Sequence, residues 1–306
     1  MYHSVWKQMK LFAGFCRWSI YRIEAKTISD RRFIEWKYKK RMGKRLDLQN
    51  PQTFSEKLQW LKLHWRSDLL TQCADKVEVR KFVEARVGSH ILKKLYGVYA
   101  NAHEIALAEL PGAFALKVNH GCKQMILCNN KKELDWPYAA RILNLHLRNN
   151  NYYHLREWAY QNIAPRILCE EHLTKDGNTM FEYNFFCYHG TPRLVEVIEI
   201  NGDERRANTY DMDLNLLWRK YKSPPIVGTL ERTEHYEEMI SYAGKLAQGF
   251  PFVRVDFALT QGRIYFGEMT FYPLGGMHRY NPEAFDEFLG SYLQLPDRNL
   301  LVHEKV

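Results

Sequence analysis

The sequence predicts an α+β protein, in which a helical, basic N-terminal segment precedes a small α/β lobe and a larger antiparallel lobe. Three observations lead to this class. With 46% hydrophobic and 26% charged residues in a chain of 306, the composition is that of a globular protein with a large core. β-branched and aromatic runs alternate with helix-period segments along the chain. In the C-terminal half, the strand-like runs are joined by short turns, which is typical of antiparallel pairing.

Composition also excludes several classes of protein. The longest apolar runs are shorter than the roughly 18 to 20 residues that span a bilayer, and the first residues lack the apolar core and cleavage site of a signal peptide. The cysteines form no CxxC pair, so we expect neither a zinc site nor a disulfide framework but a reducing, cytoplasmic environment. They are Cys16, Cys73, Cys122, Cys128, Cys169 and Cys187.

The net charge of +9 is concentrated at the N-terminus. Residues 1–47 hold thirteen basic and four acidic residues, an excess of nine, and the remainder is neutral. Bases and aromatics such as Trp18 and Trp36 are interleaved there, which predicts an amphipathic helix that contacts an anionic membrane, here the inner face. A solvated helix packed on the body is the alternative. We expect no nucleic-acid partner, because no known reading motif is present.

The first half of the chain after this segment predicts helices followed by short strands. Thr53 and Glu56 have the spacing of a capping box, so a helix is expected to begin there and continue through residue 63. The remaining predicted elements in this half are a helix over 74–85, strands over 95–99, 114–119 and 125–128, a helix over 136–149 and a strand over 166–173.

The second half predicts paired strands. Residues 182–188 and 193–200 read as strands around His189-Gly190, and residues 233–248 as a helix. Residues 252–259 and 263–270 then form a hairpin in which Gly262 supplies the turn. This hairpin places Asp256 roughly opposite Glu268.

The hairpin carries polar residues where an apolar strand face is expected. Strand alternation puts Arg254 beside Asp256 and Thr270 beside Glu268. Two facing carboxylates repel unless a cation lies between them or water reaches them, and Mg²⁺ is the cation that suits such oxygens together with substrate phosphates. A solvated face with a surface Arg254–Asp256 pair is the alternative.

Two further places have residues suited to chemistry. Lys117 lies in an apolar strand just before the turn His120-Gly121, where it either binds a phosphate or extends outward to solvent. Glu170 and Glu171 end another apolar strand, and alternation lets only one of them face a given cleft, although both can be solvent-exposed.

Nine stretches carry a shared pattern when they are taken in order. They are residues 50–63, 74–76, 95–99, 116–121, 152–158, 165–171, 185–190, 250–256 and 265–270. Together they resemble the TupA-like group of the ATP-grasp superfamily, whose members occur in bacterial cell-surface polysaccharide and teichuronopeptide biosynthesis. The resemblance implies an ATP-grasp fold, in which two α+β lobes enclose ATP.

The resemblance also implies domains and an activity. The expected parts are a basic extension (1–49), an α/β segment (50–111), a small lobe (112–173) and a large lobe with the metal site (174–306). The implied reaction is ATP-dependent carboxylate–amine ligation through an acyl phosphate. Its substrates would be an anionic glycan or sugar-acid precursor and an amine donor.

Residue roles follow by position in the pattern. The resemblance implies that Arg254 and Lys117 are catalytic, with Arg254 near the transferred phosphate. The residues implied to bind the nucleotide are Lys117, His120, Gly121, Lys123, Glu170 and Glu171. Those implied to hold Mg²⁺ are Asp256, Glu268 and Thr270.

The chain departs from the pattern in two places. Residues 122–125 replace a glycine-rich loop, and Asn184 stands where relatives usually have Lys. A catalytically degenerate ATP-grasp binding module is therefore an alternative. A glycosyltransferase that uses Asp211 and Asp213 as a DxD metal motif is another, although these residues also fit a polar turn. For an anionic substrate, candidate contacts are Tyr152, Tyr153, Arg156, Arg205, Arg206, His278 and Arg279.

Overall fold

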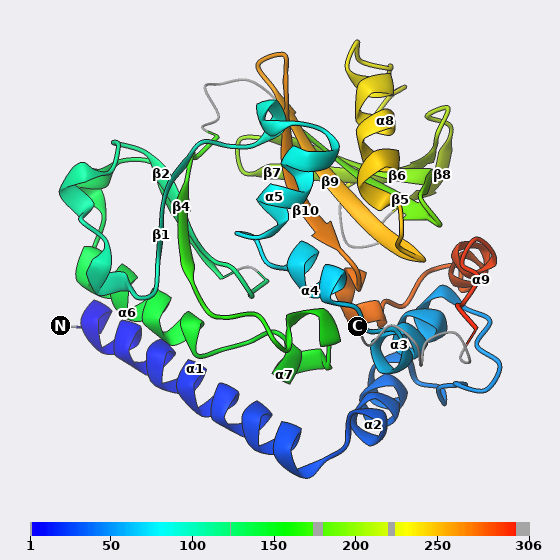
Figure 1. Ribbon diagram of the computed structural model, residues 1–306, viewed down its shortest axis with the longest axis horizontal. Coiled ribbons are helices and arrows are strands. Elements are labelled where there is room, and N and C mark those ends of the chain that lie inside the picture. The colour runs from blue at the N-terminus through cyan, green and yellow to red at the C-terminus, as the bar shows by residue number, and fades with distance from the viewer. Residues whose placement is uncertain (1, 123, 174–179, 220–223, 298–306) are drawn as a thin grey trace. The chain divides into compact units, whose positions relative to one another are not determined.

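Two compact units make up the fold. The computed structural model describes residues 2–122, 124–173, 180–219 and 224–297 (Figure 1). Unit 1 contains Met1–Lys40, Arg66–Val79 and Lys93–Thr174, and unit 2 contains Arg41–Trp65, Arg80–Leu92 and Lys175–Val306. Among the described residues, no helix is both long and apolar enough to cross a membrane.

Unit 1 is built around a four-stranded antiparallel sheet with the order β1-β4-β2-β3. Its strands are β1 (Leu95–Tyr99), β2 (Phe114–Val118), β3 (Met125–Cys128) and β4 (Ile167–Glu170). Its helices are α1 (Tyr2–Thr27), α2 (Asp30–Met42), α4 (Asp68–Ala74), α6 (Trp136–Leu147) and α7 (Tyr152–Leu155). Short 3-10 helices occur at Ala102–Glu104, Leu107–Glu109, Lys131–Glu133 and Trp158–Tyr160.

One face of this sheet forms the core of unit 1. Leu116, Val118, Ile167 and Cys169 are fully or almost fully buried and pack with Leu143 of α6. Strand alternation sends Lys117 and Glu170 to the opposite face, where Met125 and Leu127 are exposed. The opposite face is therefore exposed along β3, whereas Lys117 and Glu170 form a largely buried charged pair farther into the sheet.

Unit 2 is built around a six-stranded antiparallel sheet with the order β10-β9-β5-β6-β7-β8. Its strands are β5 (Met180–Tyr188), β6 (Thr191–Asn201), β7 (Glu204–Asp211), β8 (Leu216–Arg219), β9 (Phe252–Thr260) and β10 (Arg263–Thr270). Its helices are α3 (Phe54–His64), α5 (Val79–Arg86), which begins at the boundary with unit 1, α8 (Tyr236–Ala247) and α9 (Ala284–Ser291). The 3-10 helices are Ser89–Ile91 and Pro273–Gly276.

Helix α8 covers one face of the larger sheet. Its Tyr236 ring lies 6.1 Å from the rings of both Tyr183 and Phe185 of β5, and all three side chains are buried. Strand alternation points Asn184, which lies between Tyr183 and Phe185, to the other face of the sheet. Helix α8 therefore lies on one side of the sheet and the polar residues lie on the other.

Most predicted elements are confirmed, including the capping box at Thr53 and Glu56 and the hairpin of β9 and β10. The prediction of one helix over 74–85 is wrong, because α4 ends at Ala74 and α5 begins at Val79. Asp75 has extended backbone and accepts hydrogen bonds from the backbone N–H of Val77 and the amide of Asn119. This capping by a buried aspartate breaks the helical periodicity.

Candidate functional site

A row of buried polar side chains crosses the face of the six-stranded sheet that lies opposite α8. Thr209 of β7 pairs with Glu196 of β6, Glu196 with Asn184 of β5, and Asn184 with Asp256 of β9. These side chains lie on one face because they occupy paired register positions. The strand register thus brings residues of four strands into one polar row. This row includes Asp256, which was predicted to be a metal ligand.

A β-bulge brings Glu268 to the end of this row. Phe257 pairs with Phe266 and Val255 with Met269, so both Gly267 and Glu268 of β10 lie opposite Asp256. A Cβ on Gly267 would stand 2.9 Å from the carbonyl oxygen of Asp256, which explains why glycine is required at the first bulge position. The prediction that Asp256 lies roughly opposite Glu268 is confirmed.

Arg254 and Asp256 form a bidentate ion pair in this face. The Arg254 Nε and Nη2 atoms donate to the two Asp256 oxygens at 2.7 and 2.5 Å, and the two side chains are 15% and 12% exposed. Burial raises the pKa of the Asp256 carboxyl to about 7, and Arg254 opposes this rise whereas Glu268 and Glu196 add to it. The pair is therefore largely desolvated and is not a surface contact.

Glu268 and Thr270 extend the network. Thr270 Oγ1 donates to Glu268 Oε1 at 3.0 Å, and Arg254 Nη2 lies 3.3 Å from Thr270 Oγ1 and 3.7 Å from Glu268 Oε1. On the other side of the pair, the Asn184 amide donates to Glu196 Oε2 at 3.2 Å. One guanidinium thus lies among three carboxylates.

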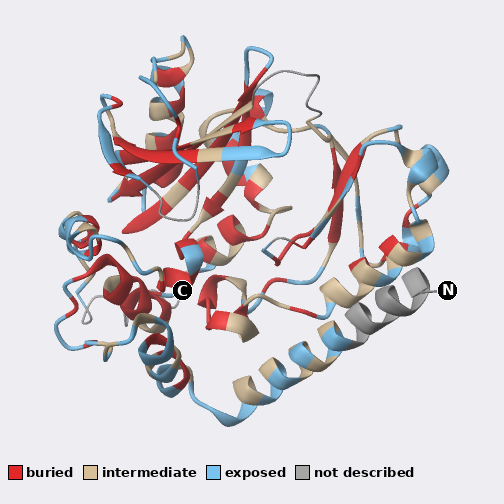
Figure 2. Cartoon of the chain, turned by 180° about the vertical axis from the view of Figure 1, so that it is seen from behind, coloured by how far each residue is buried: buried red, intermediate tan, exposed pale blue. Residues whose placement is uncertain are grey.

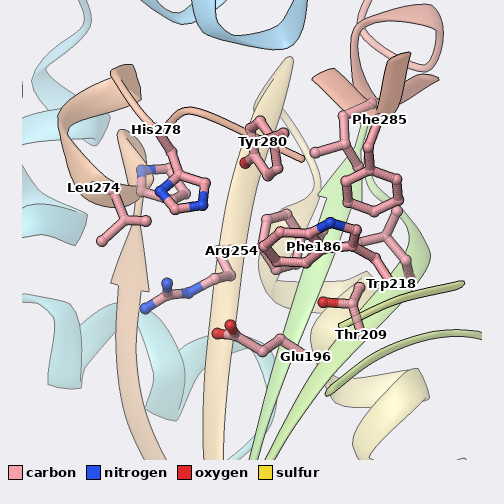
Figure 3. A pocket seen from close by; sticks show the side chains of 12 residues that line it. Phe186, Glu196, Thr209, Trp218, Arg254, Leu274, His278, Tyr280 and Phe285 are labelled. Atoms are coloured by element: carbon pink, nitrogen blue, oxygen red, sulfur yellow. The ribbon is translucent and has the colours of Figure 1, made fainter. Parts of the chain in front are cut away.

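A pocket with a cavity volume of about 50 Å³ lies beside Arg254 and Glu196 (Figure 3). Its walls are largely aromatic: Trp218 stacks on Phe285 with ring centroids 5.3 Å apart, and Tyr280 lies 5.5 Å from Trp218. His278, one of the predicted substrate contacts, also lines it. The pocket combines flat apolar surfaces with an arginine and a carboxylate.

A buried lysine holds the turn at one side of this pocket. Lys62 Nζ donates to the Gly275 carbonyl at 2.7 Å and to Gln59 Oε1 at 3.1 Å, while the Gln59 amide donates to the Gly276 carbonyl at 2.7 Å. Both side chains are almost completely buried. Helix α3 therefore positions the turn Pro273–Gly276, which contributes Pro273 and Leu274 to the pocket.

In unit 1, the sheet face opposite the core gathers a second, largely buried charged group. Lys117 Nζ donates to Glu170 Oε1 at 2.5 Å, and Lys93 Nζ lies 3.8 Å from the same oxygen. Two ammonium groups against one carboxylate give this group a net positive charge. Burial lowers the pKa of His172, and the charges of Lys117 and Lys93 lower it further.

The predicted turn after β2 has a different environment. His120 is fully buried, and its Nε2 atom lies 3.1 Å from the carbonyl of Leu147, the last residue of α6; burial lowers its pKa to about 4. The Gly121 carbonyl accepts from Lys76 Nζ at 2.8 Å. A nucleotide contact of these two residues stays a prediction, and Lys123 lies outside the described residues.

The remaining predicted residues lie elsewhere. Glu171 is tied to the chain before β1, since its backbone N–H donates to the Lys94 carbonyl at 2.8 Å. Arg205 pairs with Glu182, Arg206 pairs with Glu204, and the Arg279 Nε donates to the Arg41 carbonyl. None of these three arginines lines the pocket described above.

Two predicted substrate contacts of unit 1 are engaged within the protein. The Arg156 side chain is fully buried, with its Nε 3.2 Å from Asp30 Oδ1 and its guanidinium 4.0 Å from the Phe33 ring centroid. The Tyr152 hydroxyl donates to the same Asp30 oxygen at 2.8 Å. These contacts join α2 to α7, which is a structural role.

Asp211 and Asp213 form the predicted polar turn. Asp211 Oδ1 accepts from the backbone N–H groups of Asp213 and Asn215, and its Oδ2 accepts from the Asn215 amide. Asp213 pairs with Arg232 at 2.6 Å. Both carboxylates therefore have hydrogen-bond or ion-pair partners within the protein.

The residues of the polar row fit Mg²⁺ only together with a phosphate ligand. Across the part of the chain that is described, no group of three or more His, Cys, Asp or Glu side chains is arranged to hold a metal ion by itself. Mg²⁺ commonly uses one or two carboxylates and takes its other ligands from water and phosphate. Asp256 and Glu268, with Thr270 beside them, can supply that donor set.

Sequence reasoning missed several residues of these groups, including Thr209 and Tyr280 as well as the four that follow. Glu196 sits in a β-branched run like those of a solvated strand, Trp218 and Phe285 are common core residue types, and Lys93 lies in a polar loop. Only the pairing of β6 with β5, and of β1 with β4, brings Glu196 and Lys93 to their sites. One signal was available for Glu196, because an acidic residue interrupts the apolar run of residues 194–198.

Comparison with known proteins shows one matching family. The model of the family described as TupA-like ATPgrasp matches residues 56–294. No curated protein matches this chain.

Solved structures of ligases resemble this chain at low identity. A D-alanine–D-alanine ligase from Helicobacter pylori is 14% identical with a TM-score of 0.43, covering 78% of this chain and 69% of that one. The Bacillus anthracis D-alanine–D-alanine ligase complexed with ATP is 12% identical with a TM-score of 0.44, covering 78% and 70%. The ATP-grasp ligase PsnB complexed with a phosphomimetic variant of its minimal precursor, Mg and ADP is 11% identical with a TM-score of 0.40, covering 81% and 65%.

Proposed function

Because this chain belongs to the TupA-like ATP-grasp family, we propose that it is an ATP-dependent ligase that joins a carboxylate to an amine in the synthesis of a cell-surface polysaccharide. Family membership confirms the ATP-grasp fold. The observation that carries the proposed activity is the desolvated Arg254–Asp256 pair, which lies with buried Glu196 and half-exposed Glu268 beside an aromatic pocket.

The polar row has the properties that phosphoryl transfer requires. Catalysis of this transfer depends mainly on positioning and on neutralising negative charge in a site with little water. Mg²⁺ bound by Asp256 and Glu268 would supply charge neutralisation on the nucleotide phosphates. Arg254 is held in one orientation by its two bonds to Asp256, so its guanidinium can bind the transferred phosphate or the substrate carboxylate without first being ordered.

In unit 1, Lys117 and Lys93 provide a largely buried cationic patch on the sheet face opposite the core. Their shared partner, Glu170, keeps both ammonium groups near one position. A nucleotide phosphate would add a second anion to a group whose net charge is positive. We propose that this patch binds the phosphates of ATP, with Glu170 as the residue that positions Lys117.

The pocket of unit 2 suits a sugar acid. The flat faces of Trp218, Tyr280 and Phe285 can stack on the apolar face of a pyranose ring, and Thr209 and His278 can hydrogen-bond to its hydroxyl groups. Arg254 would receive the carboxylate, which places the group to be activated next to the polar row. This arrangement favours a uronic acid over an amino acid as the carboxylate substrate.

A catalytically inactive ATP-binding module is a second candidate. Both oxygens of Asp256 are held by Arg254, and Asn184, which stands where relatives usually have Lys, bonds to Glu196. A protein of this kind would bind nucleotide and a partner without turnover. The two candidates differ in whether ADP and phosphate are released.

Calorimetry of ATP binding with and without Mg²⁺ tests the nucleotide site. We expect Mg²⁺-dependent binding in the wild type, and loss of it in the Asp256→Ala/Glu268→Ala variant. Asp211→Asn/Asp213→Asn is the matched control, because it also removes two carboxylates of unit 2 but leaves the polar row intact. Binding of UDP-sugars with Mn²⁺ that is lost only in this control would instead assign the function to a glycosyltransferase.

Turnover separates the ligase from the inactive module. ADP release in the presence of uronic acids and a panel of amines supports the ligase. Mg²⁺-dependent ATP binding without ADP release under any of these conditions supports the module. Absence of ATP binding would refute both proposals.

A further inference from the structure

Helix α1 has one face on unit 1 and another face in solvent. Gly14, Trp18, Tyr21 and Ala25 follow one another at spacings of four, three and four, so they form one stripe along the helix. A Cβ on Gly14 would lie 3.2 Å from the Leu145 side chain of α6, and the Tyr21 ring lies 5.0 Å from the His154 ring of α7. This inner stripe fixes the orientation of the helix on unit 1.

The opposite side of α1 is apolar but exposed. Cys16, Ile20 and Ile23 form a second stripe at spacings of four and three, and Ile20 and Ile23 are 55% and 61% exposed. Phe15, next to this outer stripe, is 50% exposed. In Figure 2, α1 is coloured as intermediate or exposed wherever its burial is described, over residues 13–27. Large apolar side chains gathered on one exposed helix face indicate a binding surface.

Basic residues border the outer stripe on both sides. Helical geometry places Arg17 at one border and Lys26 at the other, with Arg22 beyond Lys26 toward unit 1. All three are exposed, and the Arg22 guanidinium also lies 5.8 Å from the Tyr153 ring centroid of α7. In α2, which follows directly, Trp36 is 50% exposed, and the ammonium groups of Lys37 and Lys40 lie 5.5 and 5.3 Å from its ring centroid. Apolar side chains flanked by long cationic ones are typical of a helix that lies in the interface of a membrane.

We propose that the outer face of α1, made of Phe15, Arg17, Ile20, Arg22, Ile23 and Lys26, binds an anionic membrane surface. Apolar residues enter the headgroup region, and the bases reach the lipid phosphates from both borders of the stripe. A second copy of this chain is a poorer occupant, because residues 1–47 carry the whole net charge of +9 and two such faces repel each other. The inference is independent of the proposed ligase activity.

Cosedimentation of the full chain with vesicles tests this surface. We expect binding to vesicles of phosphatidylcholine with 30% phosphatidylglycerol, weaker binding at high salt, and little binding to pure phosphatidylcholine. Replacing Arg17, Arg22 and Lys26 by Gln should lower the partition coefficient about a hundredfold, since each base near the surface contributes about fivefold. Ile20→Ser/Ile23→Ser should lower it by about tenfold or more at any salt concentration.

Matched controls separate this face from net charge and from folding. Lys132→Gln/Arg219→Gln/Arg263→Gln removes three exposed bases outside the basic segment and should leave binding unchanged. Arg17→Lys/Arg22→Lys/Lys26→Arg keeps the charges and should bind like the wild type. Circular dichroism melts check that each variant is folded.

Three results would overturn the proposal. They are absence of binding to anionic vesicles, equal loss of binding in the control triple variant, and a wild-type dimer that the Ile20→Ser/Ile23→Ser variant loses. The last result would assign the face to contact between copies.

Discussion

Replacement of Arg254 by Met removes the cation from the polar row while keeping a side chain of similar length. In the wild type, Arg254 makes two hydrogen bonds to Asp256 and lies 3.7 Å from Glu268. The ion pair is desolvated, with 15% and 12% of the two side chains exposed. Removing one partner of a buried pair costs about 3–5 kcal/mol, because the other charge stays buried without compensation. A solvated pair would cost at most about 1 kcal/mol.

Urea denaturation at pH 8 measures this cost, because Asp256, whose pKa is about 7 with Arg254 in place, is largely ionised in the wild type at that pH, and the loss of Arg254 removes the cation that favours the ionised form. We expect Arg254→Met to lose about 3–5 kcal/mol of unfolding free energy. Asp256→Asn should lose less, because Arg254 still faces Glu268 and Glu196. The double variant should lose less unfolding free energy than the sum of the losses in the two single variants. The difference measures the coupling between Arg254 and Asp256.

Two further measurements sharpen the result. At pH 5 the penalty in Arg254→Met should shrink, because Asp256 becomes protonated and no longer buries a charge. Mg²⁺ should stabilise this variant more than the wild type, since three carboxylates remain without their cation. Arg205→Met, which breaks the more exposed pair with Glu182, is the matched control and should cost less than about 1 kcal/mol. An Arg254→Met penalty as small as this control, and independent of pH, would refute the desolvated network.

Three other predictions concern the nucleotide patch, a buried carboxyl and the pocket turn. Lys117→Met should weaken ATP binding about 10- to 100-fold in calorimetry, and Lys93→Met less, whereas Lys132→Met should not; equal affinity in all three would remove the patch from the site. Burial raises the pKa of Asp286 to about 6, so its contribution to stability is complete below about pH 4 and is lost as the pH rises through 6. Asp286→Asn should remove this slope of up to about 3 kcal/mol in denaturation measured from pH 4 to 7, and parallel profiles for the two proteins would contradict it. Gly276→Ala should cost at least about 2 kcal/mol, because its φ is +60° and its Cβ would lie 2.5 Å from the Gln59 amide. Gly262→Ala, with φ +65° and open space around it, is the control for backbone strain alone, and an equal loss in both would exclude the steric contribution.

Local patterns in the sequence predicted most elements and part of the site. Alternation along residues 252–270 placed Arg254, Asp256, Glu268 and Thr270 on one face, because strand geometry has a strict period of two. The capping box at Thr53 and Glu56 marked the start of α3. Residue order also carried the family resemblance, which the family match over residues 56–294 confirms. These features depend on neighbours in the chain, so they can be read without the fold.

Some features looked local but were decided by distant contacts. The helix expected over 74–85 is interrupted because Asp75 bonds to Asn119, 44 residues away. Burial of His120 is another such feature, because its Nε2 atom lies 3.1 Å from the Leu147 carbonyl at the end of α6, while its implied nucleotide contact stays a prediction. A buried polar residue forms its hydrogen bonds with groups that the fold brings near it. The adjacent residues in the sequence do not identify these groups.

The tertiary structure alone decided how the site is completed. The register of β5, β6 and β7 brings Glu196 and Thr209 into the polar row, the bulge at Gly267 aims Glu268, and the pairing of β1 with β4 adds Lys93 to Glu170. The aromatic pocket combines Trp218 with Phe285, 67 positions later in the chain. Sequence determined which face each strand residue occupies, because that follows from backbone geometry. Which residues meet across strands depends on register and packing, and these are set by the burial of the whole core.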